Sequence, residues 1–308
     1  MKIIAIIKNG DEKRQLRVLS EKGHDVIAIN NTEGVRAIDA DVIVSLSEST
    51  VEDAFNLSQR YNIPFYAHID WIPPWMVFKE SEHEWGYIDK IPFHKKMNFI
   101  RKYQNLAMYW SMADVKSMSA TCFHSLMRDL VGIMDMSIYT RHPLPDVEEA
   151  IRHKTNKRKN QITCVSRFIP HKRIHHLIKA LQMIEYDGVL KLVGEGEDKN
   201  LYEAMKGDLD IEYVNTIDKY KTIAESRLVV CLWNGTVPAE SLLVDVPVVA
   251  YDNEYIREIY GNNLFYVKNN SISGLARGIQ SAFKNDSITP YHCEEDVLEK
   301  LITKAVRR

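Results

Sequence analysis

CVSRFIPHKRIHHLIKAL, residues 164–181, contains the end of a predicted strand, a turn and the start of a predicted helix. Arg167 follows the strand, Pro170 occupies the turn, and Lys172 precedes a helix that begins near Arg173. In doubly wound α/β sheets, ligands bind beyond the carboxyl ends of the strands, where helix N-termini favour anions. The stretch therefore predicts two cations placed to neutralise a diphosphate, although an isolated pair of this kind is often plain surface charge.

The alternation of strand and helix patterns continues from this stretch to the end of the chain. After the strand 161–166 and the helix 173–184, short β-branched runs predict strands, and amphipathic runs between them predict helices. The expected strands are 189–194, 211–215, 228–233 and 246–252, and the expected helices are 198–207, 219–226 and 238–245, with further helices to the end. This order predicts a second parallel α/β domain.

The first half of the chain has the same alternation. Strands are expected at 2–7, 24–30, 41–47 and 63–70, with helices at 11–23 and 51–62. Residues 69–96 mix aromatic residues with prolines and predict a shaped loop; a helix at 98–113, a strand in 114–120 and a helix through 125–132 follow. A basic, polar stretch marks the boundary near 146–160, which divides the chain into 1–150 and 151–308.

The composition excludes several classes of protein. Forty Lys and Arg against 42 Asp and Glu leave a net charge of −2, so no overall field favours nucleic acid or an anionic membrane. No apolar run has the roughly 20 residues of a membrane-spanning helix, and the N-terminus does not resemble a signal peptide. The four cysteines are far apart and predict reduced thiols and no zinc site. We expect a cytoplasmic protein, with peripheral membrane contact left open.

Two further motifs follow strands of the second half. Gly194 and Gly196 come at a strand end, where glycine lets a ligand or a neighbouring backbone approach closely. A lone GxG is weak, and its position argues against a nicotinamide cofactor. Glu240 falls in the first turn of a predicted helix, where a carboxylate can accept two vicinal ribose hydroxyls or simply complement the helix dipole.

Taken in order, these motifs resemble the C-terminal half of the family 4 glycosyltransferases, which are retaining enzymes of the GT-B fold. The resemblance covers roughly residues 161–267 and rests on the order and spacing of Arg167, Lys172, Val193, Gly194, Gly196, Glu240, residues 247–250 and Glu258. It is thinner in the first half, where it rests on the opening strand and on residues 23–26 and 113–120. It implies two Rossmann-like domains that face a cleft, with C-terminal helices returning to the first domain.

The resemblance also implies roles for individual residues. Arg167 and Lys172 would hold the donor diphosphate, Glu240 would bind the ribose, and backbone around Val214 to Ile217 would contact the base. Three positions depart from the family: Leu232 stands where it has a glutamate, and Arg173 and Asp245 stand where it has glycines. Its glycine-rich first loop is reduced here to Gly10. The donor-binding candidates are Glu240, Gly194, Gly196, Val214, Thr216, Gly10 and Leu232.

The first domain supplies candidates for the acceptor side. His68 ends a predicted strand and is placed with Arg167 and Lys172 among the catalytic candidates, although a hydrogen-bonded structural histidine fits the same pattern. Asp70 and Trp71 follow it as acceptor candidates, because carboxylates and aromatic faces suit sugar rings. The basic, aromatic run 94–110 could meet a lipid-linked acceptor, but a helix packed on the first domain explains it as well.

We therefore predict a retaining glycosyltransferase that moves a sugar from a nucleotide diphosphate donor to a hydroxyl acceptor. Two cations can serve the diphosphate, so we expect no metal and no other cofactor. A glycan or a lipid-linked acceptor fits, nucleic acid is not expected as a partner, and the oligomeric state stays open. The alternative is a nucleotide-sugar or glycan binding protein that kept the fold without catalysis. A nicotinamide enzyme or an epimerase is disfavoured, because the phosphate-site residues lie in the second domain.

Overall fold

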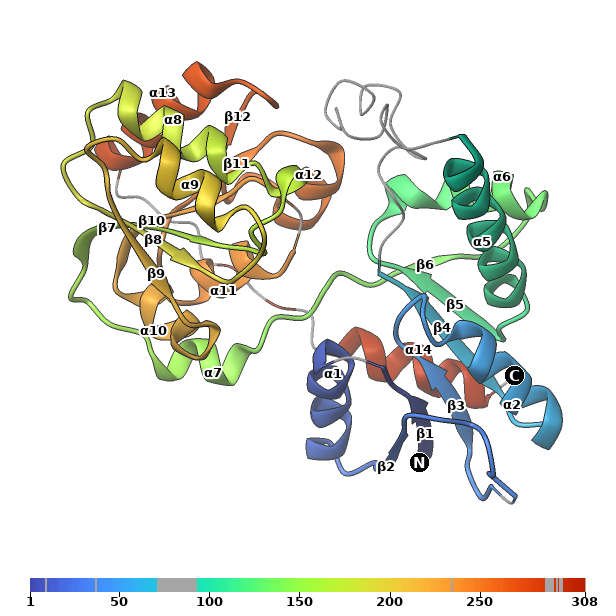
Figure 1. Ribbon diagram of the computed structural model, residues 1–308. Coiled ribbons are helices and arrows are strands. Elements are labelled where there is room, and N and C mark those ends of the chain that lie inside the picture. Colours follow the sequence, from blue (N-terminus) through green and yellow to red (C-terminus); the bar gives the residue numbers. More distant parts are fainter. Residues whose placement is uncertain are drawn as a thin grey trace. The chain divides into compact units, whose positions relative to one another are not determined.

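The computed structural model describes residues 1–8, 10–36, 38–70, 93–233, 235–285, 291, 293 and 296–307. The chain forms two compact units (Figure 1). The first contains Met1–Pro143 and Glu294–Arg308, and the second contains Leu144–Cys293. The division falls just ahead of the range 146–160, and the last residues belong to the first unit.

The first unit is a parallel sheet with strand order β2-β1-β3-β4-β5-β6. The central strands β3 and β4 are buried along their whole length and are mostly apolar, as expected when helices cover both faces of a parallel sheet. The strands are β1 (Lys2–Ile6), β2 (Asp25–Ile29), β3 (Val42–Ser45), β4 (Phe65–Ile69), β5 (Val115–Met118) and β6 (Tyr139–Thr140). The helices are α1 (Gly10–Glu21), α2 (Val51–Tyr61), α5 (Phe93–Ser111), α6 (His124–Val131) and α14 (Asp296–Val306), with a 3₁₀ turn η1 at Thr121–Phe123.

The C-terminal helix α14 completes the core of the first unit. Its buried residues Leu298, Leu301, Ile302 and Ala305 pack with Ile3 and Val44 in one apolar cluster. In Figure 1 the red helix α14 lies beside β3 of the first sheet, and it contacts β3, β4 and β5. The expected return of the chain's end to the first domain is therefore present in the fold.

The second unit is a parallel sheet with order β12-β11-β10-β7-β8-β9. Its strands are β7 (Lys159–Val165), β8 (Val189–Val193), β9 (Asp210–Val214), β10 (Ser226–Cys231), β11 (Val248–Tyr251) and β12 (Phe265–Val267). The helices are α7 (Val147–Arg152), α8 (Ile174–Met183), α9 (Lys199–Met205), α10 (Lys219–Ala224), α11 (Val237–Leu243), α12 (Glu254–Tyr260) and α13 (Ile272–Lys284). Two 3₁₀ turns, η2 (Pro170–Lys172) and η3 (Thr216–Asp218), follow β7 and β9.

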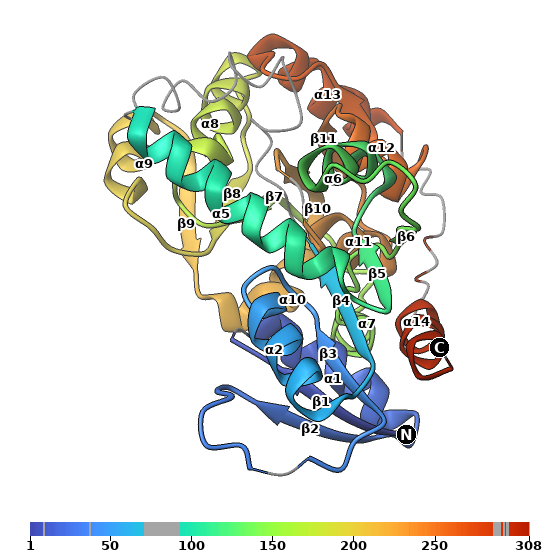
Figure 2. The same cartoon turned by 90° about the vertical axis from the view of Figure 1, so that its right-hand side faces the viewer.

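Helices α8 and α13 lie together on one face of the second sheet (Figures 1 and 2). The apolar residues of α8, among them Ile174, Leu177, Ile178 and Leu181, are buried against Ile162, Leu190 and Val230 of the strands. This packing fixes the start of α8, and with it the turn that carries Lys172.

The structure contains three short elements that the sequence did not predict: β6, β12 and α7. β6 and β12 contain two and three residues, too few for a periodic pattern. α7 lies inside the basic linker stretch, where Asp146 caps it by accepting from the Glu149 N–H at 3.3 Å. Most of the shaped loop predicted for 69–96, including Trp71, lies outside the described residues.

Candidate functional site

Arg167 and Lys172 line one pocket at the carboxyl edge of the second sheet. The chain runs from β7 outward to β8 and β9, then crosses to β10 on the other side of β7, so strand order reverses between β7 and β10. Such a switch point is where doubly wound sheets bind ligands. The pocket there has a volume of about 140 Å³ and is lined by Cys164, Val165, Ser166, Arg167, Lys172, Cys231, Leu232, Trp233 and Val237.

The two cations differ in their surroundings. Arg167 is exposed in the loop after β7, whereas Lys172 is half-buried at the end of η2. Burial, followed by the repulsion of Arg167, lowers the pKa of Lys172 to about 8. The Lys172 ammonium also lies 5.0 Å from the centre of the Trp233 ring. An anion bound in the pocket would offset both burial and the repulsion of Arg167, because its negative charge stabilises the protonated form of Lys172.

Gly194 and Gly196 position the loop that carries Arg167. Both have left-handed backbones, with φ of +138° and +151°. A Cβ on Gly194 would lie 2.0 Å from the Ser166 carbonyl oxygen, and one on Gly196 would lie 2.4 Å from that of Phe168. The Phe168 N–H donates to the Glu195 carbonyl at 2.7 Å across this contact. Of the two uses that the sequence left open, the structure shows the approach of a neighbouring backbone.

The two positions that lack the family's glycines keep a left-handed backbone. Arg173 has φ +55° and Asp245 has φ +59°. Arg173 is 4% exposed, and its Nη1 donates to Asn269 Oδ1 at 3.3 Å. Since a non-glycine residue adopts this region at a cost, contacts such as these hold the turn before α8 in place.

Glu240 is completely buried in the first turn of α11 and is paired with Lys219, which the sequence analysis did not single out. Lys219 Nζ lies 3.0 Å from Glu240 Oε1, and Thr236 Oγ1 donates to the same oxygen at 3.1 Å. Burial works to lower the pKa of Lys219, but Glu240 and Tyr220 together outweigh it, so the pKa is raised. Val237, which lines the pocket, lies one turn before Glu240 on α11, so the two residues are neighbours along this helix.

The loop proposed for the base follows β9. The Val214 carbonyl accepts the Gly194 N–H at 3.4 Å, which ties the ends of β8 and β9 together. Thr216 is exposed at the start of η3, and Asn215 Oδ1 accepts the Ile217 N–H at 3.1 Å. Ile217 itself is 85% exposed, an unusual state for a large apolar side chain.

Leu232 lies between the apolar core of the second unit and the pocket. It is 5% exposed and belongs to the apolar core of the second unit, yet it also lines the pocket beside the two cations. Trp233 adjoins it and was not singled out from the sequence. Cys231 Sγ contacts the Trp233 carbonyl oxygen at 2.7 Å. Burial raises the pKa of this thiol to about 11, and a buried protonated thiol is typical of a structural cysteine.

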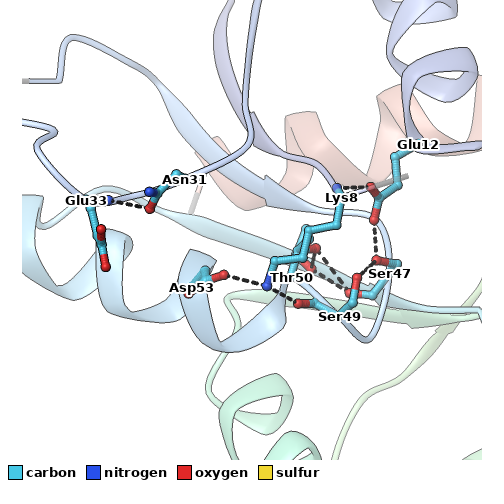
Figure 3. A network of polar contacts seen from close by, with 9 residues as sticks. Lys8, Glu12, Asn31, Glu33, Ser47, Ser49, Thr50 and Asp53 are labelled. Atoms are coloured by element: carbon cyan, nitrogen blue, oxygen red, sulfur yellow. Dashed lines mark hydrogen bonds and ion pairs between the residues drawn. The ribbon is translucent and has the colours of Figure 1, made fainter. Parts of the chain in front are cut away.

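A network of polar contacts lies at the switch point of the first sheet, between β1 and β3 (Figure 3). Gly10 begins α1 there. The Lys8 N–H donates to Glu12 Oε2 at 2.5 Å, and Ser47 Oγ donates to the other oxygen of this buried carboxylate. Lys8 Nζ contacts Asp53 Oδ2 at 2.8 Å. Polar groups that are satisfied within the chain do not attract a diphosphate, so the charge pattern favours the second sheet as the anion site.

His68 and Asp70 belong to a buried chain of hydrogen bonds in the first unit. His68 Nε2 lies 2.7 Å from Asp70 Oδ1, His68 Nδ1 lies 2.8 Å from Ser117 Oγ, and Ser117 Oγ lies 2.6 Å from the Tyr66 hydroxyl. Burial lowers the pKa of His68 to about 4, so the ring is neutral. Because Nε2–H donates to Asp70, Nδ1 must accept from the Ser117 hydroxyl, and Ser117 in turn accepts from the Tyr66 hydroxyl. All three hydrogen bonds are therefore oriented toward the Asp70 carboxylate.

Asp70 is the exposed end of this chain, with 34% of its side chain accessible. Burial would raise the pKa of Asp70, but the hydrogen bond from the neutral His68 ring and the positive charges of Arg141 and Arg14 hold it below its ordinary value. Arg141 Nη2 lies 3.9 Å from Asp70 Oδ1. The result is an oriented carboxylate at the end of β4 that can accept a hydroxyl. Within the described ranges there is no cluster of three or more His, Cys, Asp or Glu side chains that could hold a metal ion.

Fold and pocket together define a GT-B protein, with two Rossmann-like parallel sheets and paired cations at the switch point of the second. A family model described as "Glycosyl transferases group 1" matches residues 147–300. The chain belongs to this family of glycosyltransferases. No curated protein matches it. In the described part of the chain, no helix has both the length and the apolar character required to cross a bilayer.

Solved structures share the fold at low sequence identity. HepE from Anabaena, in complex with UDP and glucose, is 16% identical with a TM-score of 0.65, over 99% of this chain and 92% of that one. HepE in complex with UDP-glucose gives a TM-score of 0.64 at 17% identity, over 99% and 93% of the two chains. Sucrose-phosphate synthase from Thermosynechococcus elongatus is 13% identical with a TM-score of 0.69, over 100% and 97%. None of these comparisons favours the alternative of a non-catalytic sugar-binding protein.

Proposed function

We propose that this glycosyltransferase takes its sugar from a nucleoside diphosphate donor held by the second unit. The observation that carries the proposal is the pocket at the β7–β10 switch point, in which Arg167 and Lys172 meet. A diphosphate needs both charge and directed donors, and a guanidinium together with an ammonium supplies them. The structures of HepE with UDP and with UDP-glucose make uridine donors the first to test.

The difficult step of the reaction is departure of the nucleoside diphosphate while positive charge develops on the sugar. Arg167 and Lys172 would stabilise the negative charge that appears on the leaving group, and they are in place before the reaction. We propose that no metal is needed, because these two cations neutralise the diphosphate. We also propose retention, by attack on the face from which the phosphate leaves, with that phosphate taking the acceptor proton.

The ribose would bind beside Glu240, one turn of α11 from the pocket. Lys219 Nζ lies 3.0 Å from Oε1 of this buried carboxylate and fixes its position, and a carboxylate oxygen can accept a hydroxyl. The base would then lie along residues 214–217. Lys219 therefore becomes a positioning residue of the donor site.

The acceptor hydroxyl would bind to Asp70 on the first unit. The chain of donors from Tyr66 through Ser117 and His68 fixes one carboxylate oxygen, and the side chain is accessible. In this proposal His68 acts through Asp70 as a positioning residue, because His68 itself is completely buried.

Donor turnover tests the proposal. The protein is incubated with UDP-, GDP- and dTDP-sugars and a mixture of hydroxyl acceptors, and release of the nucleoside diphosphate is measured by chromatography. We expect release that depends on Arg167 and is lost in Arg167→Ala but kept in Lys179→Ala, which removes an exposed cation further along α8. Release that is equal in wild type and Arg167→Ala would refute the proposed site. The anomeric proton coupling of the product tests retention.

A further inference from the structure

Part of the pocket lining is an apolar wall. Leu232, Trp233 and Val237 line this wall, from the end of β10 and the start of α11. Among the described residues that line the pocket, none is Asp, Glu, Asn or Gln. A group attached to a diphosphate in this pocket would therefore meet carbon atoms where a sugar-binding site ordinarily offers carboxylates or amides.

The wall is held in place from several sides. Leu232 is 5% exposed and anchored in the apolar core of the second unit. The Trp233 ring faces the Lys172 ammonium at 5.0 Å, and its carbonyl oxygen contacts Cys231 Sγ at 2.7 Å. These contacts hold apolar carbon atoms of Leu232 and Trp233 at the pocket.

Hydroxyl groups and apolar groups respond to such a wall in opposite ways. A sugar hydroxyl pressed against Leu232 would lose its hydrogen bonds to water and gain none in return. A CH₂ or CH₃ group at the same place would gain burial. The lining also contains the Ser166 hydroxyl, which belongs to the loop that carries Arg167, and two thiols. Burial raises the pKa of Cys231 to about 11 and that of Cys164 to about 12, so both thiols are uncharged.

We propose that the donor sugar is a deoxy sugar, with CH₂ or CH₃ in place of a hydroxyl-bearing carbon at the edge that meets Leu232 and Trp233. This inference rests on the proposed function, because it assumes that the diphosphate lies between Arg167 and Lys172. Leu232, Trp233 and Val237 are then specificity-determining residues, separate in role from the cations.

Calorimetric titration with matched donors tests the proposal. The pairs are UDP-glucose against UDP-6-deoxyglucose and UDP-2-deoxyglucose, GDP-mannose against GDP-6-deoxymannose, and dTDP-glucose against dTDP-6-deoxyglucose. On the nucleotide that binds, a deoxy form should bind about 10- to 100-fold more tightly than its hydroxylated partner, the discrimination that an apolar pocket achieves against an added hydroxyl. Equal or tighter binding of the hydroxylated sugar on every nucleotide would overturn the proposal.

Two variants assign the preference to the wall. Val237→Thr keeps the shape of the side chain but adds a hydroxyl, and Leu232→Gln adds an amide; each should reduce the preference. If Leu232→Gln does not fold because Leu232 is also a core residue, Val237→Thr decides. An undiminished preference in Val237→Thr would place the sugar elsewhere. Binding of free UDP, GDP and dTDP to wild type and Arg167→Ala reports separately on the diphosphate site, so failure of the proposed function is distinguishable from failure of the sugar assignment.

Discussion

Lys219 Nζ lies 3.0 Å from Glu240 Oε1, and this contact joins the start of α10 to the first turn of α11. Glu240 is completely buried and Lys219 keeps 19% of its side chain exposed. The buried carboxylate of Glu240, which follows β10, is therefore neutralised by Lys219, which follows β9. In the sheet, β9 and β10 lie on opposite sides of β7.

Lys219→Met should destabilise the second unit by about 3 kcal/mol, because it leaves a buried carboxylate without its counter-charge. Glu240→Gln placed in the Lys219→Met background should recover much of the loss, since the cost comes from the uncompensated charge. Urea unfolding of both single variants and the double variant measures the coupling. Strictly additive changes would show that the two side chains do not interact in solution.

His68 should make stability depend on pH. In the folded protein, burial lowers the pKa of His68 from its ordinary value of 6.5 to about 4. Between pH 6.5 and 4, His68 is therefore protonated in the unfolded chain but not in the folded protein. The free energy of unfolding should fall as pH drops from about 6.5 to 4, by up to roughly 3 kcal/mol for this residue. His68→Gln should flatten that slope. His176→Gln measures the similar contribution of His176, whose pKa burial also lowers to about 4. An unchanged profile in His68→Gln would argue against a neutral buried ring.

Gly194→Ala should reduce stability far more than an alanine substitution at a glycine that has open space around its Cα. Its Cβ would lie 2.0 Å from the Ser166 carbonyl, so β8 and the Arg167 loop must separate, at a cost of roughly 3 kcal/mol with weaker diphosphate binding. Gly34→Ala is the control, since Gly34 also has a left-handed φ, +79°, but no heavy atom lies within 4 Å of its Cβ; we expect about 1 kcal/mol there. Thermal unfolding compares them, and equal losses would mean that backbone strain alone explains Gly194.

The sequence predicts the two sheets because their strands are uniform apolar runs separated by amphipathic helices. Residues 164–181 also predict the position of Arg167 and Lys172, since a strand, a turn and a helix start fix which edge of the sheet they reach. The structure places both in one pocket, and it adds Cys231 and Trp233, which no residue pattern indicated, beside Leu232, which was a donor-site candidate only through the family resemblance. That arrangement depends on β10 lying next to β7, which is a matter of strand order.

The residues missed by sequence reasoning are those that act through distant partners. Lys219 is an ordinary lysine at the start of a helix until the fold brings Glu240 to it. Ser117 likewise becomes part of the His68 chain only because β5 pairs with β4, with Ser117 opposite His68 in register. Near Gly10, the contact between Ser47 and Glu12 also joins residues that are far apart in the sequence, so it could not be read from a local pattern.

Diphosphate binding should weaken as pH rises above 8. Burial lowers the pKa of Lys172 to about 8, and a bound anion would raise it, so binding takes up a proton at higher pH. Affinity for UDP, GDP or dTDP should fall roughly five- to tenfold per pH unit above 8 until the pKa of the complex is reached. In Lys172→Arg, whose guanidinium stays charged, the affinity should be level from pH 7.5 to 9.5. A wild-type affinity that is also level would show that Lys172 does not meet the anion.

The most direct test of the diphosphate site is calorimetric titration of Arg167→Ala, Lys172→Ala and Glu240→Ala with the nucleoside diphosphate that binds wild type, and with its nucleoside. Charge-assisted hydrogen bonds to phosphate contribute roughly 1.5 to 3 kcal/mol each, so Arg167→Ala and Lys172→Ala should each weaken diphosphate binding about 10- to 100-fold and leave nucleoside binding unchanged. Glu240→Ala should weaken both ligands, because the ribose is common to them. Diphosphate binding by Arg167→Ala and Lys172→Ala that is as tight as in wild type would contradict the account.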